Sequence, residues 1–172
     1  MSIYVEWAKE VIELYVKEGK IAENKKLKAN ELMMEKAACF VSIHLKNKNL
    51  RGCIGTIAPR EETLYEEIRN NAISASTEDP RFYPIDISEL NNLVINIDIL
   101  GTIYKLKDFG ILNPEKYGVI VEKGRQRGLL LPNLEGVDTV ERQLEIAKEK
   151  AGLTGYTNNE IEISYFSVTR YY

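Results

Sequence analysis

The chain has 172 residues, of which 44% are hydrophobic and 28% are charged, and its formal net charge at pH 7 is −3. This length and composition predict one globular domain that needs neither a disulfide nor a structural metal for stability. The acidic balance and the scatter of the basic residues exclude nucleic-acid binding as a working hypothesis, and no apolar run approaches the roughly 20 residues of a membrane helix.

The chain offers few residues for metal binding. Cys39, Cys53 and His44 are its only cysteines and histidine, too few for a structural zinc site or an iron–sulfur cluster, so we expect no metal and no cofactor. The N-terminal segment carries acidic residues throughout and lacks the basic start and apolar centre of a signal peptide. We therefore predict a cytoplasmic protein in a reducing compartment.

Capping residues and hydrophobic spacing predict the elements of the first half. Helices are expected over 3–18, 30–37 and 63–77, a helical turn over 87–91, and strands over 39–45, 50–57 and 93–100. Gly19 is placed to end the first helix, and Thr63 with Glu66 forms a capping box at the start of the third.

The second half repeats this order. It predicts a hairpin over 117–132 that turns near Lys123 and Gly124, then a helix over 139–151 capped by Asp138 and Glu141, and a closing strand over 161–168.

A pair of residues occupies the same place late in both hairpins, Arg51-Gly52 in the first and Arg127-Gly128 in the second. We interpret this as an internal duplication of a hairpin–helix–strand (ββαβ) unit, although an α+β chain can repeat this order by chance. The predicted fold is α+β, with two antiparallel sheets that each carry a helix on one face. The domain would span 1–172, with two intertwined subdomains over roughly 38–100 and 115–168.

The first hairpin carries the chain's candidate chemistry. A symmetric turn at Asn47 and Lys48 pairs Ser42 with Cys53 and His44 with Arg51. Strand faces alternate with period two, so these four polar side chains share one face, while the apolar residues of both strands face the 63–77 helix. If the strand over 93–100 lies in the same sheet, its polar face brings Asp98 to this site.

One interpretation of this face is a catalytic site. Cys53 would be the nucleophile, Arg51 would lower its pKa, and His44, oriented by Asp98, would assist as a base. Ligand contacts would come from residues beside the thiol and from the DPRF loop, where an aspartate and an arginine could hold an anionic or amide group. These ligand-binding candidates are Gly52, Gly55, Thr56, Asp79 and Arg81.

A structural interpretation of Cys53 and Arg51 stands beside the catalytic one. The second repeat places Leu129 where the first has Cys53, which suits a packed position where cysteine acts as a small hydrophobe. Arg51 could anchor a carboxylate or a carbonyl, as its repeat at Arg127 suggests. In the expected register Cys39 and Cys53 point to opposite faces, so we predict no disulfide between them.

The other candidates also have structural alternatives. Asp79 could cap a turn and pair with Arg81 while Phe82 fills the core. His44 could simply be an exposed hairpin residue.

Several short runs stand in a recognisable order: LRGCIGTI, NAISAS followed by DPRF, KYGVIV, RGLLLPNLEGVDT and KAGL. Together they resemble the AMMECR domain family over roughly 1–168, in particular the prokaryotic A proteins of the AmmeMemoRadiSam system. One departure is Cys39 in KAACFVS, where relatives often carry a small or hydroxyl residue. The resemblance implies a two-part α+β fold with LRGCIG near a cleft, and no established activity.

Two functions follow as hypotheses. The resemblance implies an accessory or binding component that acts with a Memo-like protein and a radical S-adenosylmethionine protein. The alternative is a cysteine-dependent enzyme that uses Cys53 on a small-molecule or protein substrate. A homodimer is expected only because homodimers are common.

Overall fold

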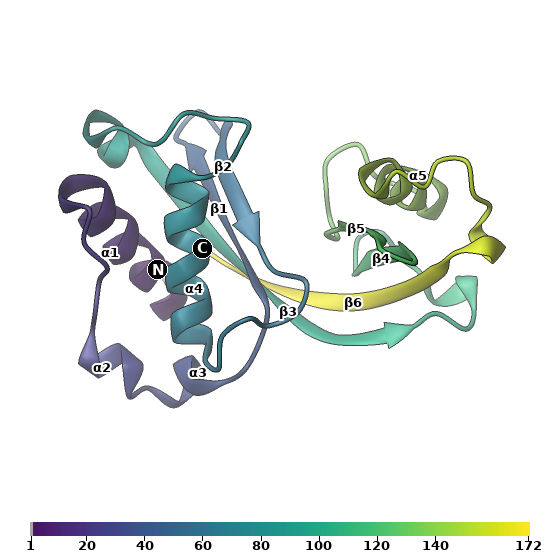
Figure 1. Ribbon diagram of the computed structural model, residues 1–172, viewed down its shortest axis with the longest axis horizontal. Helices are drawn as coiled ribbons and strands as arrows, with labels where there is room; N and C mark the ends of the chain where they lie inside the picture. Colours follow the sequence, from purple (N-terminus) through teal and green to yellow (C-terminus); the bar gives the residue numbers. More distant parts are fainter. Residues whose placement is uncertain (1) are drawn as a thin grey trace. The chain divides into compact units, whose positions relative to one another are not determined.

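The computed structural model describes residues 2–172, which form two compact units (Figure 1). Unit 1 comprises the chain up to Ile99 together with Thr169–Tyr172, and unit 2 comprises Leu100–Val168. The fold is α+β, as predicted, but all six strands lie in one sheet with the order β2-β1-β3-β6-β4-β5. The prediction of two separate sheets is wrong because β3 (Leu93–Lys105) and β6 (Glu162–Tyr171) are long enough to run through both units.

Unit 1 packs two helices on one side of its hairpin. Figure 1 shows α4 (Leu64–Thr77) in front of β1 (Cys39–Leu45) and β2 (Leu50–Gly55), with α1 (Ile3–Glu18) beside it. Trp7 of α1 is fully buried and stacks on Tyr65 of α4, with their ring centroids 4.4 Å apart. The Trp7 indole N–H also donates to the Tyr65 carbonyl at 2.9 Å, so the contact leaves no unpaired donor in the core.

The helix boundaries of unit 1 follow their capping residues. Gly19 ends α1 in the left-handed conformation at φ +65°, and the Thr63 hydroxyl accepts from the Glu66 N–H at the start of α4, as predicted. The predicted 30–37 helix is the single turn α3 (Glu31–Met34), capped by Asn30. A further turn, α2 (Lys25–Lys28), precedes it and is not among the predicted helices. Residues Ile87–Asn92 form the 3-10 helix η1.

Unit 2 repeats the hairpin–helix order. Its hairpin, β4 (Tyr117–Lys123) and β5 (Gln126–Leu130), turns at Gly124, whose φ is +60°. Helix α5 (Val140–Ala151) packs on both strands and ends at Ala151, as predicted, with Gly152 as its C-cap. Its N-cap is Thr139 rather than Asp138, because the Thr139 hydroxyl accepts from the Arg142 N–H at 3.1 Å. Two 3-10 turns, η2 (Phe109–Ile111) and η3 (Asn158–Glu160), complete the unit.

None of the helices within residues 2–172 is both long enough and apolar enough to cross a bilayer.

Candidate functional site

The register of the first hairpin confirms part of the prediction. Ser42 lies opposite Cys53, as expected. Beyond it Ile43 pairs with Gly52 and His44 with Leu50, so Arg51 is an extra residue in a β-bulge. The predicted pairing of His44 with Arg51 is therefore wrong, because the bulge shifts the register by one residue between the turn and the thiol.

The thiol lies on the sheet face turned away from α4, as predicted. Ser42 of β1 stands between Cys53 of β2 and Asn96 of β3, which places the three side chains in one row across the face. The Ser42 hydroxyl oxygen and the Cys53 sulfur are 3.2 Å apart. The opposite face carries Gly52, whose backbone lies against α4. We call the face that carries this row the polar face of unit 1.

Cys53 is a partly buried and unactivated thiol. Burial raises its pKa above the usual value, and the Asp98 and Asp79 carboxylates act in the same direction. The contact with Ser42 and the charge of Arg81 lower the pKa, but they do not outweigh burial. The group is therefore a neutral thiol at pH 7, whereas nucleophilic attack requires the thiolate.

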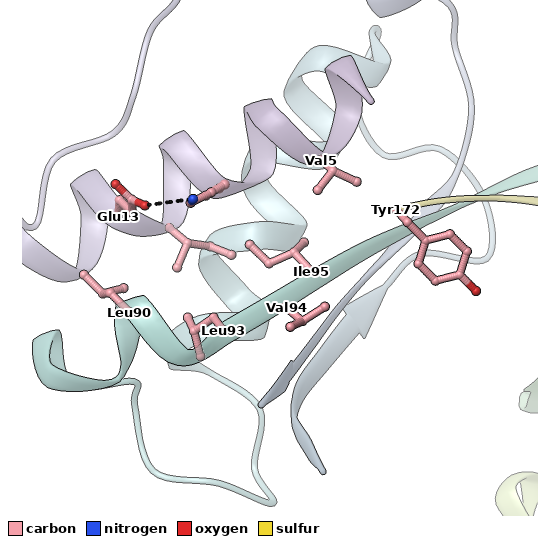
Figure 2. Close-up of a pocket in the computed structure, with 9 residues that line it drawn as sticks. Val5, Glu13, Leu90, Leu93, Val94, Ile95 and Tyr172 are labelled. Carbon is pink, nitrogen blue, oxygen red and sulfur yellow. Dashed lines mark ion pairs between the residues drawn. The ribbon is translucent and has the colours of Figure 1, made fainter. Parts of the chain in front are cut away.

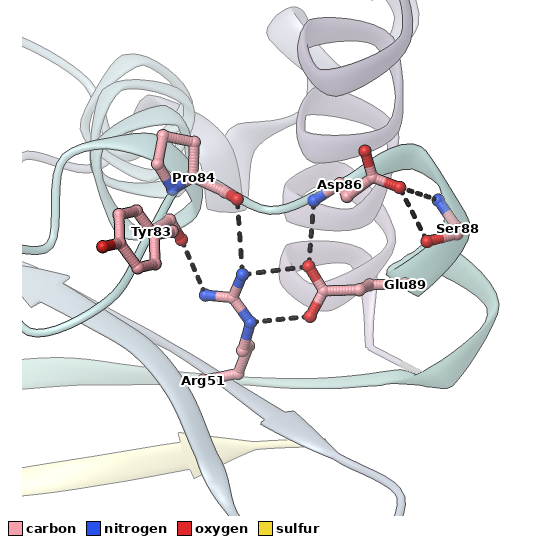
Figure 3. Close-up of polar contacts among 6 residues, drawn as sticks. All are labelled: Arg51, Tyr83, Pro84, Asp86, Ser88 and Glu89. Atoms are coloured by element: carbon pink, nitrogen blue, oxygen red, sulfur yellow. Dashed lines mark hydrogen bonds and ion pairs between the residues drawn. The ribbon is translucent and has the colours of Figure 1, made fainter.

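Arg51 is held by other partners and does not activate Cys53 (Figure 3). Its guanidinium forms a two-point ion pair with the Glu89 carboxylate of η1, at 2.7 and 2.9 Å, and donates to the Tyr83 and Pro84 carbonyls at 2.9 and 3.3 Å. Only 14% of its side chain is exposed. The predicted activating role fails on this geometry, and Arg51 is the anchor for a carboxylate and carbonyls that the alternative described.

The same carboxylate also completes the cap of η1. Glu89 accepts from the Asp86 N–H at 2.9 Å, while the Asp86 side chain accepts from the Ser88 N–H at 2.9 Å (Figure 3). Arg51 thus ties β2 to a capping box and fixes the loop that leads into β3.

The predicted His44–Asp98 pair does not form. Asp98 is fully buried opposite Phe40, and Arg170 of β6 binds both of its carboxylate oxygens at 2.7 and 2.9 Å. His44 lies opposite Val94, farther along the same face. Burial lowers the pKa of His44, and the charge of Arg170 acts in the same direction, so the imidazole is neutral at pH 7.

Sequence reasoning missed Arg170 because it lies beyond the predicted end of the last strand at residue 168. Within YFSVTRYY, β-branched and aromatic residues continue to the end of β6, and that strand propensity could have extended the strand although the alternation breaks at Thr169 and Arg170.

Gly52 and Gly55 leave no room for a ligand. A Cβ at Gly52 would lie 2.1 Å from the Ala75 carbonyl oxygen of α4, and one at Gly55 would lie 2.3 Å from the Phe40 ring. The predicted space is thus filled by a helix backbone and by an aromatic side chain. Thr56 is also engaged, because its buried hydroxyl donates to the Glu67 carboxylate.

The DPRF loop covers the outer edge of β2. This strand is at the end of the sheet, so the outward backbone groups of Cys53 have no strand partner. The Asp79 carboxylate accepts from the Cys53 N–H at 2.9 Å, and Arg81 donates to the Cys53 carbonyl at 3.3 Å. Asp79 and Arg81 are also paired with each other at 2.7 Å, which confirms the structural alternative for both residues.

Phe82 has a different place from the one predicted. It is half-buried outside the core cluster, and its ring lies 5.9 Å from the Arg51 guanidinium and 5.5 Å from that of Arg81. It therefore supports the two arginines instead of filling the core.

Unit 1 contains two hollows. One, of about 400 Å³, lies between α1 and the start of β3 and is lined mainly by apolar side chains (Figure 2). It contains none of the predicted site residues. The other, of about 450 Å³, lies on the polar face and includes His44. No group of three potential metal ligands was found within residues 2–172.

Comparison with known proteins identifies the family. A family model described as AMMECR1 matches residues 5–171. The chain belongs to the AMMECR1 family. A protein of Thermotoga maritima is 50% identical over 168 residues, which cover 98% of this chain and 96% of the relative. The crystal structure of the uncharacterised protein PH0010 from Pyrococcus horikoshii has a TM-score of 0.88 at 30% identity, covering 97% of this chain and 88% of that one.

One AMMECR1 relative is much longer than this chain. A protein of Clostridium acetobutylicum is 45% identical over 169 residues, which cover 98% of this chain but only 35% of that protein. In that relative the AMMECR1 region is therefore one part of a larger polypeptide.

The edge contact of the AMMECR1 fold predicts a pH effect at Asp79. The Arg81 guanidinium holds the pKa of Asp79 far below its usual value, with a further lowering from the Cys53 N–H, against the raising effect of burial. The stability that ionised Asp79 contributes is therefore complete above about pH 5 and declines progressively as the pH falls below about 4, toward the very low pKa of the folded state. Asp79→Asn should be less stable than the wild type at pH 7, and the difference should be clearly smaller at pH 2.5, as urea unfolding at each pH would measure.

The matched control is Asp138→Asn, which changes an exposed carboxylate that forms no hydrogen bond or ion pair within residues 2–172. Its stability should follow the wild-type pH profile. A stability difference for Asp79→Asn that is as large at pH 2.5 as at pH 7 contradicts the assignment.

Proposed function

We propose that this AMMECR1-family chain is a binding or accessory component of an AmmeMemoRadiSam-type system, corresponding to its protein A and acting in the cytoplasm. Its partners would be a Memo-like protein and a radical S-adenosylmethionine protein. One observation carries the proposal: every charged candidate side chain is already held by a partner within unit 1. Arg51 binds Glu89, Asp98 binds Arg170, and Asp79 binds Arg81.

This pairing favours binding over catalysis. A general base or an activated nucleophile needs an ionisable group that is free to exchange a proton with the substrate. The Cys53 thiol has a raised pKa, and neither His44 nor Arg51 bonds to it. What the polar face offers instead is a fixed row of neutral hydrogen-bonding groups, which suits the recognition of a ligand at LRGCIG.

The longer Clostridium relative supports a role beside other protein modules. Its AMMECR1 region occupies 35% of the chain, so the remaining length is available for other domains. Fusion of two domains in one chain keeps them together at a high effective concentration. A domain that acts by binding a partner protein can therefore keep its function when it is fused to that partner.

Co-expression with the Memo-like and radical S-adenosylmethionine proteins encoded in the same genome tests the proposal. We expect a tagged chain to retain at least one of them through gel filtration, and Cys53→Ser to retain it equally well. Recovery of neither partner by the folded wild-type chain would refute the proposal.

A cysteine-dependent enzyme is the second candidate function. It is favoured by the partial exposure of Cys53 and by the charge of Arg81, which lowers the thiol pKa. Under this alternative, Cys53→Ser would abolish any turnover by the assembled system while leaving the assembly intact.

We also propose that the chain arose by internal duplication of a ββαβ unit over roughly 38–100 and 115–168. Two shared features support it. A glycine in the second hairpin strand, Gly52 or Gly128, lies against a helix carbonyl in each unit. A helix side-chain amide, Asn71 or Gln143, donates to the carbonyl of the first hairpin residue, at 3.0 and 2.8 Å.

A further inference from the structure

The hollow on the polar face is a groove at the turn end of the first hairpin. Its volume is about 450 Å³, which is in the range of small-molecule sites. All its residues belong to unit 1: His44, Leu45, Lys46, Lys48, Val94, Asn96, Arg170 and Tyr172. Four of them are basic side chains, although the whole chain has a net charge of −3.

Asn96 is the buried polar group of this groove. It is only 8% exposed, yet its side-chain amide makes no hydrogen bond to any of residues 2–172. Its amide atoms are not sealed from solvent, since Gln143 Oε1 is the side-chain atom of residues 2–172 that is both buried and unpaired; they open into the groove, where a ligand atom could bond to them. The amide can donate to a ligand oxygen and accept from a ligand N–H or O–H.

The charges in the groove are positive and partly free. Lys46 and Lys48 are exposed and form no ion pair within the described part of the chain. Arg170 is already balanced by Asp98, and Tyr172 also raises its pKa. With His44 neutral, the two lysines supply the charge that a ligand would neutralise.

The backbone of Lys48 is in an unfavourable conformation for its residue type. Its φ is +72°, in the left-handed region that glycine and asparagine adopt most readily. Glycine would adopt the same conformation without the steric cost that the lysine Cβ imposes. The tight hairpin turn accounts for this conformation, because the Lys48 N–H closes the turn on the Leu45 carbonyl at 2.8 Å, and the position can therefore be changed to glycine without disturbing the turn.

We propose that this groove binds a small molecule through an anionic oxygen group, a phosphate or a carboxylate. The group would lie between the Lys46 and Lys48 ammonium groups, and a neutral polar atom beside it would bond to the Asn96 amide. Leu45 and Val94 would contact an apolar part of the ligand. The site is separate from the Cys53 thiol, and the inference does not depend on the partner proteins.

An NMR titration of the wild-type chain tests the groove. One arm adds inorganic phosphate and the other adds sodium acetate, both at constant ionic strength, while the Asn96 side-chain NH₂ and Lys48 amide signals are followed. We expect saturable shifts in at least one arm, with a dissociation constant on the order of 1 mM for so small a probe. The tighter arm identifies phosphate or carboxylate as the preferred group. Shifts in neither arm, or the same shifts on adding sodium chloride, overturn the proposal.

Lys48→Gly separates binding from folding. The glycine relieves the positive φ, so the variant should be at least as stable as the wild type, and it should bind the preferred anion about tenfold more weakly. Lys107→Ala removes an exposed lysine of unit 2 and serves as the charge control, with unchanged affinity expected. Equal affinity for Lys48→Gly and Lys107→Ala would refute the assignment.

Discussion

Gly52→Ala is expected to lower the free energy of unfolding by about 3 kcal/mol, the upper end of the usual cost of overpacking. The new Cβ would lie 2.1 Å from the Ala75 carbonyl oxygen and 3.2 Å from its carbon. Both are backbone atoms of α4, so no flexible side chain can move aside. The helix must shift away from the sheet, or the strand must bend, and either change loosens the core beneath LRGCIG.

Urea unfolding of two further glycine variants makes this result specific. Gly128→Ala should be similarly damaging, because its Cβ would lie 2.2 Å from the Ala147 carbonyl oxygen of α5. Gly155→Ala should change stability by less than about 0.5 kcal/mol, since nothing lies within 4 Å of its added Cβ. If Gly52→Ala were as mild as Gly155→Ala, the close approach of α4 to β2 would be wrong.

Arg51→Ala should cost about 2 kcal/mol, somewhat less than the loss of a fully buried ion pair, because 30% of the Glu89 side chain is exposed. The variant removes the donor to the Tyr83 and Pro84 carbonyls and leaves the Glu89 carboxylate with the Asp86 N–H as its remaining donor. The cost should appear as a lower urea midpoint with an unchanged slope.

The second hairpin provides the matched control. Arg127 pairs with Glu122 at 3.2 Å, and their side chains are 40% and 44% exposed. Arg127→Ala should therefore cost less than about 0.5 kcal/mol. Similar losses for the two variants would mean that Arg51 is not an anchor. Arg51→Ala should also leave the pH dependence of Cys53 alkylation unchanged, because Arg51 makes no contact with the thiol.

Strand alternation and helix capping, which depend only on neighbouring residues, predicted part of the site correctly. Strand alternation placed Cys53 beside Ser42 on the face away from α4, and capping chemistry placed the end of α1 and the start of α4. The bulge at Arg51 was not predictable, because the alternation is the same for a regular hairpin. The bulged Arg51 binds Glu89, which lies 38 residues further along the chain and is not visible to a local pattern.

Long-range partners account for the remaining differences. The sequence analysis paired Asp98 with His44. In the structure Asp98 forms its ion pair with Arg170, which is 72 residues away along the chain. The partner of Asp98 depends on which strand lies beside β3. That strand is β6, and this neighbour could not be predicted from local patterns. Gly52 and Gly55 were predicted to leave space for a ligand. In the structure α4 packs against Gly52 and the Phe40 ring packs against Gly55, so both glycines are contact points.

The LRGCIG segment thus contributes to the structure through three neighbouring residues. Arg51 forms an ion pair with Glu89 of η1, and Gly52 allows α4 to pack closely on β2. The backbone N–H and carbonyl of Cys53 form hydrogen bonds with Asp79 and Arg81. The Cys53 side chain is the part left to face a ligand, and its chemistry decides between a binding surface and a reactive centre.

The pH dependence of iodoacetamide alkylation at Cys53 tests this account most directly. Peptide mass spectrometry separates Cys53 from Cys39, which is fully buried and whose pKa burial raises to about 12. We expect the rate at Cys53 to keep rising above pH 8.5, the pKa of an ordinary thiol. A rate that reaches its plateau below about pH 7.5 would reveal a stabilised thiolate and contradict the assignment of Cys53 to an unreactive binding surface.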